Sequence, residues 1–282
     1  MRTYPTCYPC MVRQAVNVLQ QNQIEPEIQF QALKKVLNCL ALADPNLSPS
    51  EIAGETNRII RETIDLDDLY LEEKKASHQL AMSYLDDLRQ LAGQGTDPLE
   101  QALKISAAGN VIDVIHIEDY DLWTEVQASV NGRLVGGGLE AFRERLSTVS
   151  HLLVLADNVG ETVFDRVLIE TLSIPVIYAV KSGPILNDAG RQDAEAAGID
   201  QLAEIVENGT RSPGTVLSQT APEFRELFER SSLVLSKGQA NYETMDEQGD
   251  KVFFLLRIKC PLLSEKLNAP QGSVVLKQGG FQ

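Results

Sequence analysis

Three segments of the chain place carboxylate, amide and ammonium side chains directly after short apolar runs. They are Asp157 and Asn158 after the run 152–156, Lys181, Asn187 and Asp188 after the run 174–180, and Lys237 and Gly238 after the run 233–235. Carboxylate and amide oxygens suit a hard divalent cation such as Mg²⁺ or Mn²⁺. A lysine followed by glycine suits a phosphoryl group, because the ammonium supplies a point charge beside accessible backbone N–H groups. Together the segments predict a cation and a phosphoryl group bound at one place.

Each of these residues also has a purely structural interpretation. Aspartate and asparagine after a strand commonly cap the following helix. Glu161 suits either a catalytic base or a favourable charge in a first helical turn. Asn110 and Asp113 follow Gly109, which is typical of a helix end and a turn, although a domain seam would let both reach the same cleft. Because three separate strand ends carry the first set, their convergence favours a site there.

The elements that must position these residues form an α/β pattern from residue 106 to residue 282. Short, nearly continuous apolar runs alternate there with amphipathic segments. This alternation is typical of a mostly parallel sheet that helices cover on both faces. The predicted strands lie at 151–156, 174–180, 232–235, 252–256 and 273–276. Ligands of open α/β sheets bind at the carboxyl ends of the strands, which is where the polar residues occur.

Residues 1–105 predict an all-helical N-terminal part. Apolar residues recur there at spacings of three and four, most clearly between residues 66 and 91. Ser48 and Glu51 form a capping-box pattern around a first-turn proline, and Asp97 begins a further helix in the same style. No stretch alternates with period two, so we expect no strand in this part.

Four motifs occur in the order found in one known family. They read Gly109-Asn110-x-x-Asp113, Asp157-Asn158-x-Gly160-Glu161-x-x-Phe164-Asp165, Gly183-Pro184-Ile185-Leu186-Asn187-Asp188 and Ser236-Lys237-Gly238-Gln239-Ala240-Asn241-Tyr242-Glu243. With the opening Cys7-x-x-Cys10, they make the chain resemble the prokaryotic branch of the damage-control phosphatase family, formerly called domain of unknown function eighty-nine. The likeness covers nearly the whole chain.

The resemblance implies a Rossmann-like three-layer α/β/α domain preceded by the helical part. It implies a phosphatase of small phosphorylated metabolites, such as sugar phosphates, that depends on Mg²⁺, Mn²⁺, Co²⁺ or Ni²⁺. By position, the metal ligands would be Asp157, Asn158 and Asp188. Lys237 would hold the phosphate, and Asn110 and Asp113 would line the substrate cleft.

Combining the strand ends with the resemblance gives a full set of expected site residues. The expected catalytic residues are Asp157, Glu161 and Lys237, and the expected substrate-contacting residues are Asn110, Asp113, Lys181, Asn187, Lys237 and Gly238. Attack by water and formation of an aspartyl-phosphate at Asp157 both remain open. The Asp-x-Asp pattern of haloacid-dehalogenase-type phosphatases is not present at Asp157, so the second route has no direct support.

Two other functions compete with a phosphatase. A eukaryotic relative in this family has been described as a protein carboxyl methyltransferase, which uses S-adenosylmethionine. The glycine run 136–138 is a weak sign of such an enzyme, because no acidic partner stands at the next strand end. A non-catalytic protein that binds a metal and a phosphometabolite would carry the same residues.

The overall charge excludes two classes of partner. The 282 residues include 40 acidic and 25 basic side chains, for a net charge of −15. Such a chain lacks the basic surface that binds nucleic acid or an anionic membrane. No apolar run reaches the roughly 18–20 residues of a membrane span, and the first residues lack the apolar stretch of a signal peptide. We therefore expect a cytoplasmic protein.

The four cysteines are too few for a disulfide scaffold. Cys7 and Cys10 have the spacing of a redox or zinc motif. A thioredoxin-like site needs a strand before it, however, and a zinc site needs two more ligands. We expect thiols packed at the start of the first helix, with a structural metal or a disulfide as the alternative. Nothing in the sequence indicates an oligomeric state.

Overall fold

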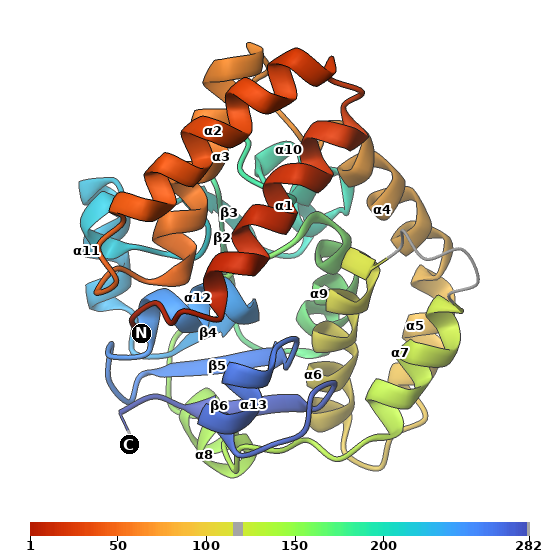
Figure 1. Cartoon of the computed structure of the whole chain (residues 1–282). Helices are drawn as coiled ribbons and strands as arrows, with labels where there is room; N and C mark the ends of the chain where they lie inside the picture. Colours follow the sequence, from red (N-terminus) through yellow and green to blue (C-terminus); the bar gives the residue numbers. More distant parts are fainter. Residues whose placement is uncertain (115–120, 281–282) are drawn as a thin grey trace.

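A six-stranded sheet forms the centre of the molecule (Figure 1). A computed structural model describes residues 1–114 and 121–280, with their side chains except those of residues 113 and 114. The strands are β1 (Leu152–Leu155), β2 (Val176–Val180), β3 (Glu204–Glu207), β4 (Val234–Lys237), β5 (Val252–Arg257) and β6 (Val274–Gln278). Their order across the sheet is β3-β2-β1-β4-β5-β6.

Strands β1 to β5 are parallel, and β6 pairs antiparallel with β5 at the edge. The mostly parallel sheet predicted from the sequence is therefore confirmed. From β1 the chain proceeds to β2 and β3 on one side and returns to β4 on the other. The strand order reverses between β1 and β4, and open α/β sheets bind ligands beyond the carboxyl ends of the strands at such a point.

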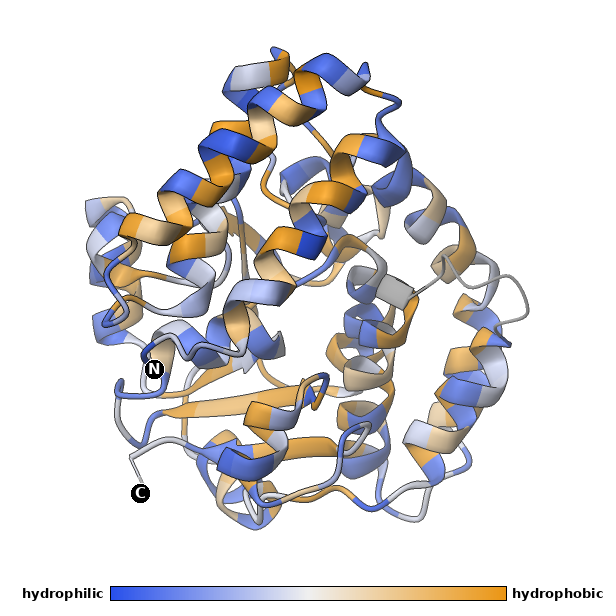
Figure 2. Ribbon diagram, in the orientation of Figure 1, coloured by the Kyte–Doolittle hydropathy of each residue, from blue (hydrophilic) through white to orange (hydrophobic). Residues whose placement is uncertain are grey.

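Helices cover both faces of the sheet. They are α4 (Leu71–Ser83), α5 (Leu85–Ala92), α6 (Pro98–Ala108), α7 (Leu122–Asn131), α8 (Leu139–Leu146), α9 (Val159–Thr171) and α10 (Arg191–Ala196) on one core, and α11 (Pro222–Arg230), α12 (Gly238–Met245) and α13 (Pro261–Leu267) on the other. Successive residues of a strand point to opposite faces. Leu152 and Val154 accordingly enter the first core, and Leu153 and Leu155 the second. Figure 2 shows the hydrophobic residues gathered along the strands.

The N-terminal helices form a separate bundle with its own core. It consists of α1 (Cys7–Gln21), α2 (Pro26–Leu42) and α3 (Pro49–Ile64), which lie together in Figure 1. The predicted capping box of α3 is confirmed, because Ser48 Oγ accepts from the backbone N–H of Glu51 at 3.2 Å and the Glu51 carboxylate accepts from the N–H of Ser48 at 2.8 Å. Leu19, Val36 and Ile60 are each buried in this core.

The helices between residues 71 and 108 pack on the sheet instead of on this bundle. Ala81, Leu88 and Leu103 from α4, α5 and α6 enter the same core as β1 and β2. The hydrophobic core thus changes near residue 70, and the domain boundary predicted at residue 105 stays a prediction. None of the helices in the described part of the chain has the length and apolar character of a membrane span.

One strand was not predicted. β3 lies at the edge of the sheet, and its sequence begins and ends with the exposed residues Glu204 and Glu207. Only Ile205 is buried. An edge strand with charged ends lacks the long apolar run that marks the interior strands, so the apolar pattern did not reveal it.

Candidate functional site

Backbone contacts bring the ends of β1 and β2 together. Asp157 and Asn158 lie between β1 and α9, and Asp188 lies in the loop that follows β2. The N–H of Ala189 donates to the carbonyl of Asp157 at 2.8 Å, and Asn158 and Asp188 pair as an isolated antiparallel bridge. The three predicted metal ligands are buried, with 4–6% of each exposed. The structure therefore gathers them at the strand-order reversal.

Gly238 lets the carboxylate of Asp157 approach the end of β4. Its φ of +77° is a conformation that glycine adopts without steric penalty. A Cβ at this position would lie 1.8 Å from Asp157 Oδ2. Gly238 is also the first residue of α12, so the carboxylate lies at a helix N-terminus, where backbone N–H groups and the helix dipole favour negative charge.

Replacing Gly238 with alanine is expected to remove at least about 99% of the catalytic activity, because misplacing a reacting group by about 1 Å costs on the order of 100-fold. The new Cβ would displace the Asp157 carboxylate. A Gly249→Ala variant is the matched control, since Gly249 also has a positive φ (+81°) but a Cβ there would meet nothing within 4 Å. Steady-state kinetics and thermal unfolding of both variants separate the collision from the backbone strain. Equal losses of activity in Gly238→Ala and Gly249→Ala would contradict the collision with Asp157.

The side chain of Asn110 also contacts the Asp157 carboxylate. It lies in the 3₁₀ helix η1 (Gly109–Val114), and its Nδ2 donates to Asp157 Oδ2 at 3.1 Å and to Glu161 Oε1. Its Oδ1 is buried and has no hydrogen-bond partner among the described residues. α6 ends at Ala108 with Gly109 (φ −54°) as its C-cap, so the predicted helix end is confirmed, and the 3₁₀ helix η1 follows it in place of the predicted turn. The side chain of Asp113 lies outside the described residues.

The side chain of Asn158 does not cap the helix that follows it. This residue occupies the N-cap position of α9 but makes no side-chain capping hydrogen bond. Its Nδ2 instead faces Glu161 Oε1 at 3.3 Å. An N-cap residue normally accepts from the second or third backbone N–H of its helix, so the side chain of Asn158 is oriented toward the site.

A buried ammonium links two carboxylates of α9. Lys237 Nζ donates to Glu161 Oε2 at 2.7 Å and to Asp165 Oδ1 at 2.6 Å, and neither lysine nor carboxylate side chain is more than 1% exposed. Asp165 also accepts from the hydroxyls of Ser106 and Tyr178. We did not predict Asp165, Ser106 or Tyr178 as site residues. The one available signal was the spacing of Glu161 and Asp165, which puts two carboxylates on one helix face.

The network changes the acid–base properties of its members. Burial raises the pKa of Glu161 to about 8, against the attraction of Lys237, and the nearby charges of Asp157 and Asp165 add to the rise. Burial disfavours the charged form of Lys237, but Asp165 and Glu161 outweigh it and raise the pKa of this ammonium above its usual range. Lys237 therefore stays positive, and Glu161 is able to exchange a proton near neutral pH.

The raised pKa of Glu161 predicts that metal-free protein loses stability as the pH rises from about 5 to about 8. In the unfolded chain this carboxyl ionises near its ordinary pKa of 4.5, whereas in the folded chain it keeps its proton until about pH 8. Between those values the unfolded state binds fewer protons, so the free energy of unfolding falls by up to ~1.4 kcal/mol per pH unit. Urea unfolding with a chelator at several pH values measures the slope. Glu161→Gln should flatten it, and an unchanged slope would refute this assignment.

The two remaining residues that we predicted to contact the substrate lie in the loop after β2. Lys181 is buried, its Nζ donates to the carbonyl of Gly214, and it lies 3.4 Å from Asp188 Oδ2. Asn187 is half-buried, and its carbonyl accepts from the N–H of Val159 at 2.9 Å. The structure thus brings all the described site residues together around the ends of β1, β2 and β4.

Known proteins resemble this chain along nearly its whole length. Residues 3–275 match the damage-control phosphatase ARMT1-like domain. A damage-control phosphatase of Pyrococcus horikoshii is 30% identical over the full length of both chains. One from Archaeoglobus fulgidus is 26% identical, covering 98% of this chain and 99% of the relative. The crystal structure of a DUF89 family protein from Pyrococcus horikoshii superposes with a TM-score of 0.89 and 30% identity, covering 99% of each chain.

The chain belongs to the damage-control phosphatase family. Membership confirms the resemblance seen in the sequence and supports a phosphatase activity. It also agrees with the Rossmann-like α/β/α architecture, because a DUF89 family structure has the same fold along nearly the whole chain.

The charges of this damage-control phosphatase site fit a divalent cation. With every group ionised, four buried carboxylates (Asp157, Glu161, Asp165 and Asp188) face two ammonium groups (Lys181 and Lys237), which leaves two negative charges in excess. A divalent cation would neutralise that excess. Among the described residues, no three His, Cys, Asp or Glu side chains form a metal-binding group. A cation here therefore depends on the amide oxygen of Asn158 beside the two aspartates.

The cysteine pair of the family resemblance lies at the start of the first helix. α1 begins at Cys7, which packs against the bundle core, while Cys10 is exposed. Both thiols are free, and burial raises the pKa of Cys7. The predicted packing at the start of the first helix is confirmed for Cys7.

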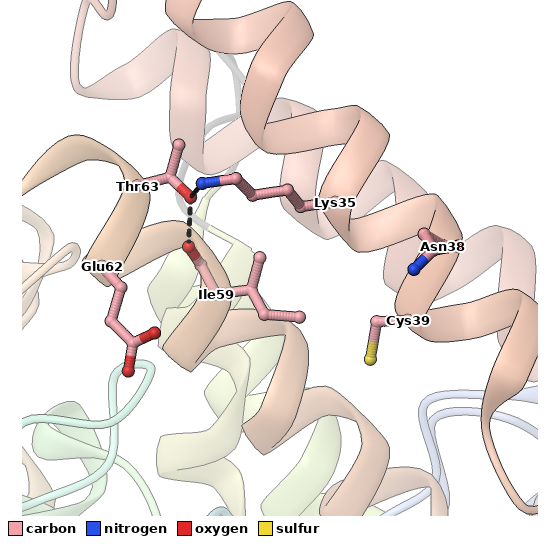
Figure 3. A pocket seen from close by; sticks show the side chains of 6 residues that line it. All are labelled: Lys35, Asn38, Cys39, Ile59, Glu62 and Thr63. Carbon is pink, nitrogen blue, oxygen red and sulfur yellow. Dashed lines mark hydrogen bonds between the residues drawn. The ribbon is translucent and has the colours of Figure 1, made fainter.

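A surface pocket between α2 and α3 contains none of the predicted site residues. Figure 3 shows its lining, in which Lys35 Nζ donates to the hydroxyl of Thr63 at 3.1 Å and that hydroxyl donates to the carbonyl of Ile59 at 2.7 Å. Its only carboxylate belongs to Glu62. This pocket is therefore separate from the candidate site.

Proposed function

We propose that the chain is a divalent-metal-dependent phosphatase that hydrolyses small phosphorylated metabolites, such as sugar phosphates or damaged phosphometabolites. Asp157, Asn158 and Asp188 would hold the cation, which would be Mg²⁺, Mn²⁺, Co²⁺ or Ni²⁺. The observation that carries the proposal is the cluster of four buried carboxylates facing two ammonium groups where the strand order reverses, beside the N-terminus of α12. The printed names of two relatives, both damage-control phosphatases, support the reaction type.

The protein's own residues supply binding and proton handling. When bound, a divalent cation supplies positive charge to the phosphoryl oxygens and polarises phosphorus. The first N–H groups of α12 and the Lys181 ammonium would bind phosphoryl oxygens near Asp157. Glu161, whose pKa lies at about 8, would hold or deliver the proton that the reaction exchanges at its carboxylate.

The observed contacts favour a supporting role for Lys237. We predicted that its ammonium contacts the phosphate, but that group is fully buried and donates to Glu161 and Asp165. In this arrangement Lys237 would fix the position and charge of Glu161 instead of contacting the substrate. The direct contact with phosphate stays a prediction.

The test is phosphate release by purified protein from p-nitrophenyl phosphate and a panel of sugar phosphates. Each substrate is assayed with Mg²⁺, Mn²⁺, Co²⁺ or Ni²⁺ and with a chelator. We expect release that depends on the cation and returns when the cation is restored after chelation. Failure to release phosphate from any substrate with any cation would reject the proposal, and tight binding of S-adenosylmethionine in calorimetry would favour the methyltransferase.

The methyltransferase alternative has little structural support. Gly136 and Gly138, which were its main sequence feature, pack against the backbone of β6: a Cβ on either would lie within 2.7 Å of the carbonyl oxygen of Leu276. Val135 also pairs with Val275 as an extra bridge at this edge. The glycines therefore serve close packing on a strand.

A further inference from the structure

Leu186 lies in the loop that carries two site residues, yet it packs on the N-terminal bundle. The loop joins β2 to α10 and contains Asn187 and Asp188. The Leu186 side chain, in contrast, contacts the core formed by α1, α2 and α3 and not either core of the sheet. An apolar side chain of the site loop therefore contacts the bundle directly.

The bundle provides a narrow hollow for this side chain. Val18 of α1, Ile60 of α3 and Tyr70 line it together with Leu186. These three bundle residues are each at least 90% buried. The lining is mixed, because the apolar Ala15 and Ala53 and the polar Gln14, Thr56 and Asn57 complete it. The Leu186 side chain packs on its apolar part.

Leu186 holds an unfavourable backbone conformation at this place. Its φ is +45°, a left-handed value that glycine and asparagine adopt more readily than leucine. Strained residues persist where the surrounding structure fixes them, and they cluster at functional sites. The half-buried Leu186 side chain packs on the bundle core at this strained position, so the bundle is part of the structure that fixes its conformation.

A second tie connects the same two parts of the molecule. Arg211 donates to Asp67 Oδ1 at 2.6 Å, just before α4, and to the carbonyl of Pro184 at 3.3 Å. Gly183 permits this approach, because a Cβ there would lie 2.8 Å from Arg211 Cδ. The loop is thus held to the N-terminal part on both sides of Ile185.

The anchored residue immediately precedes the contacts that join β1 and β2 at the site. The carbonyl of Asn187 accepts from the N–H of Val159, and the N–H of Ala189 donates to the carbonyl of Asp157. A shift of Leu186 would move these partners, since they lie one and three residues further along the loop. We propose that Leu186 is a positioning residue through which the N-terminal bundle holds Asn187 and Asp188 in register with Asp157. The consequence for metal binding rests on the proposed function.

The experiment compares Leu186→Asn with Leu186→Met and Val36→Ala. Asparagine is close to leucine in size and tolerates the positive φ, but it is polar; methionine keeps an apolar anchor. Val36 is buried in the same core on α2, away from the hollow, and controls for general loosening of the bundle. Hydrogen exchange of the Val159 and Ala189 amides is measured in metal-free protein, and the dissociation constant for Mn²⁺ is measured by calorimetry.

Leu186→Asn is expected to speed exchange of both amides at least tenfold and to weaken Mn²⁺ binding at least tenfold. Leu186→Met and Val36→Ala should remain within about threefold of wild type. The inference is overturned if Leu186→Asn exchanges these amides at the wild-type rate or binds Mn²⁺ with wild-type affinity. It is also overturned if Val36→Ala changes the exchange rate and the affinity as much as Leu186→Asn does. Wild-type protein that binds no Mn²⁺ would instead count against the proposed function, and the exchange comparison would still decide the anchor.

Discussion

Asp157→Asn is expected to lower metal-dependent phosphate release about 1000-fold, equivalent to ~4 kcal/mol of transition-state stabilisation. Asparagine preserves the shape of the side chain but removes a charge, so the buried excess of negative charge falls by one. It also places an amide where Asn110 Nδ2 now donates to a carboxylate oxygen at 3.1 Å. Both changes weaken cation binding. Steady-state kinetics across a range of Mn²⁺ concentrations, with a calorimetric dissociation constant, measures the loss.

The same substitution separates the site from a helix cap. Asparagine and aspartate cap helices about equally well, so a residue that only caps tolerates the exchange. Asp97 caps α6, since its Oδ1 accepts from the N–H of Glu100 at 3.2 Å, and its Oδ2 pairs with the exposed Arg143. Asp97→Asn should therefore keep full activity. Near-wild-type turnover in Asp157→Asn as well would mean that Asp157 is not a metal ligand.

The sheet could be predicted because its interior strands are buried on both faces. Leu152 to Leu155 are all apolar, which marks a buried strand independently of its neighbours. β3 could not be found in this way, because an edge strand pairs on one side only and its residues face solvent in part. The positions of Asp157 and Asp188 followed from the rule that parallel strands end at a common edge.

The buried network of Glu161, Asp165 and Lys237 could not be predicted, because it depends on which faces of α9 the rest of the protein buries. In sequence, Glu161 and Asp165 resemble the polar face of an amphipathic helix. In the structure ten of the thirteen residues of α9 are buried, and Gly109 and Gly160 allow η1 and α9 to approach within van der Waals contact. Local spacing does not reveal which faces a helix buries. The contact of Leu186 with the bundle could not be predicted either, because its partners lie more than a hundred residues away in the sequence.

Lys237→Met is expected to destabilise the fold by about 3–5 kcal/mol, because removing one partner of a buried ion pair leaves uncompensated charge. Here two carboxylates, Glu161 and Asp165, would lose their ammonium in a region that water does not reach. Protonation of Glu161, whose pKa is raised, would relieve part of the penalty, so the loss should be larger at pH 8 than at pH 5. Urea unfolding of metal-free protein at both pH values measures it.

A second variant tests whether charge, and not lost packing, causes the effect. Adding Asp165→Asn to Lys237→Met removes one uncompensated charge while keeping a polar group beside the hydroxyls of Ser106 and Tyr178, so the double variant should recover part of the stability. Lys75→Met is the control for an exposed pair, since Lys75 contacts Glu72 at 2.8 Å on the surface and should contribute less than about 1 kcal/mol. If Lys237→Met behaves like Lys75→Met, the buried ammonium does not hold the two carboxylates, and Lys237 is free to contact the substrate as the sequence predicted.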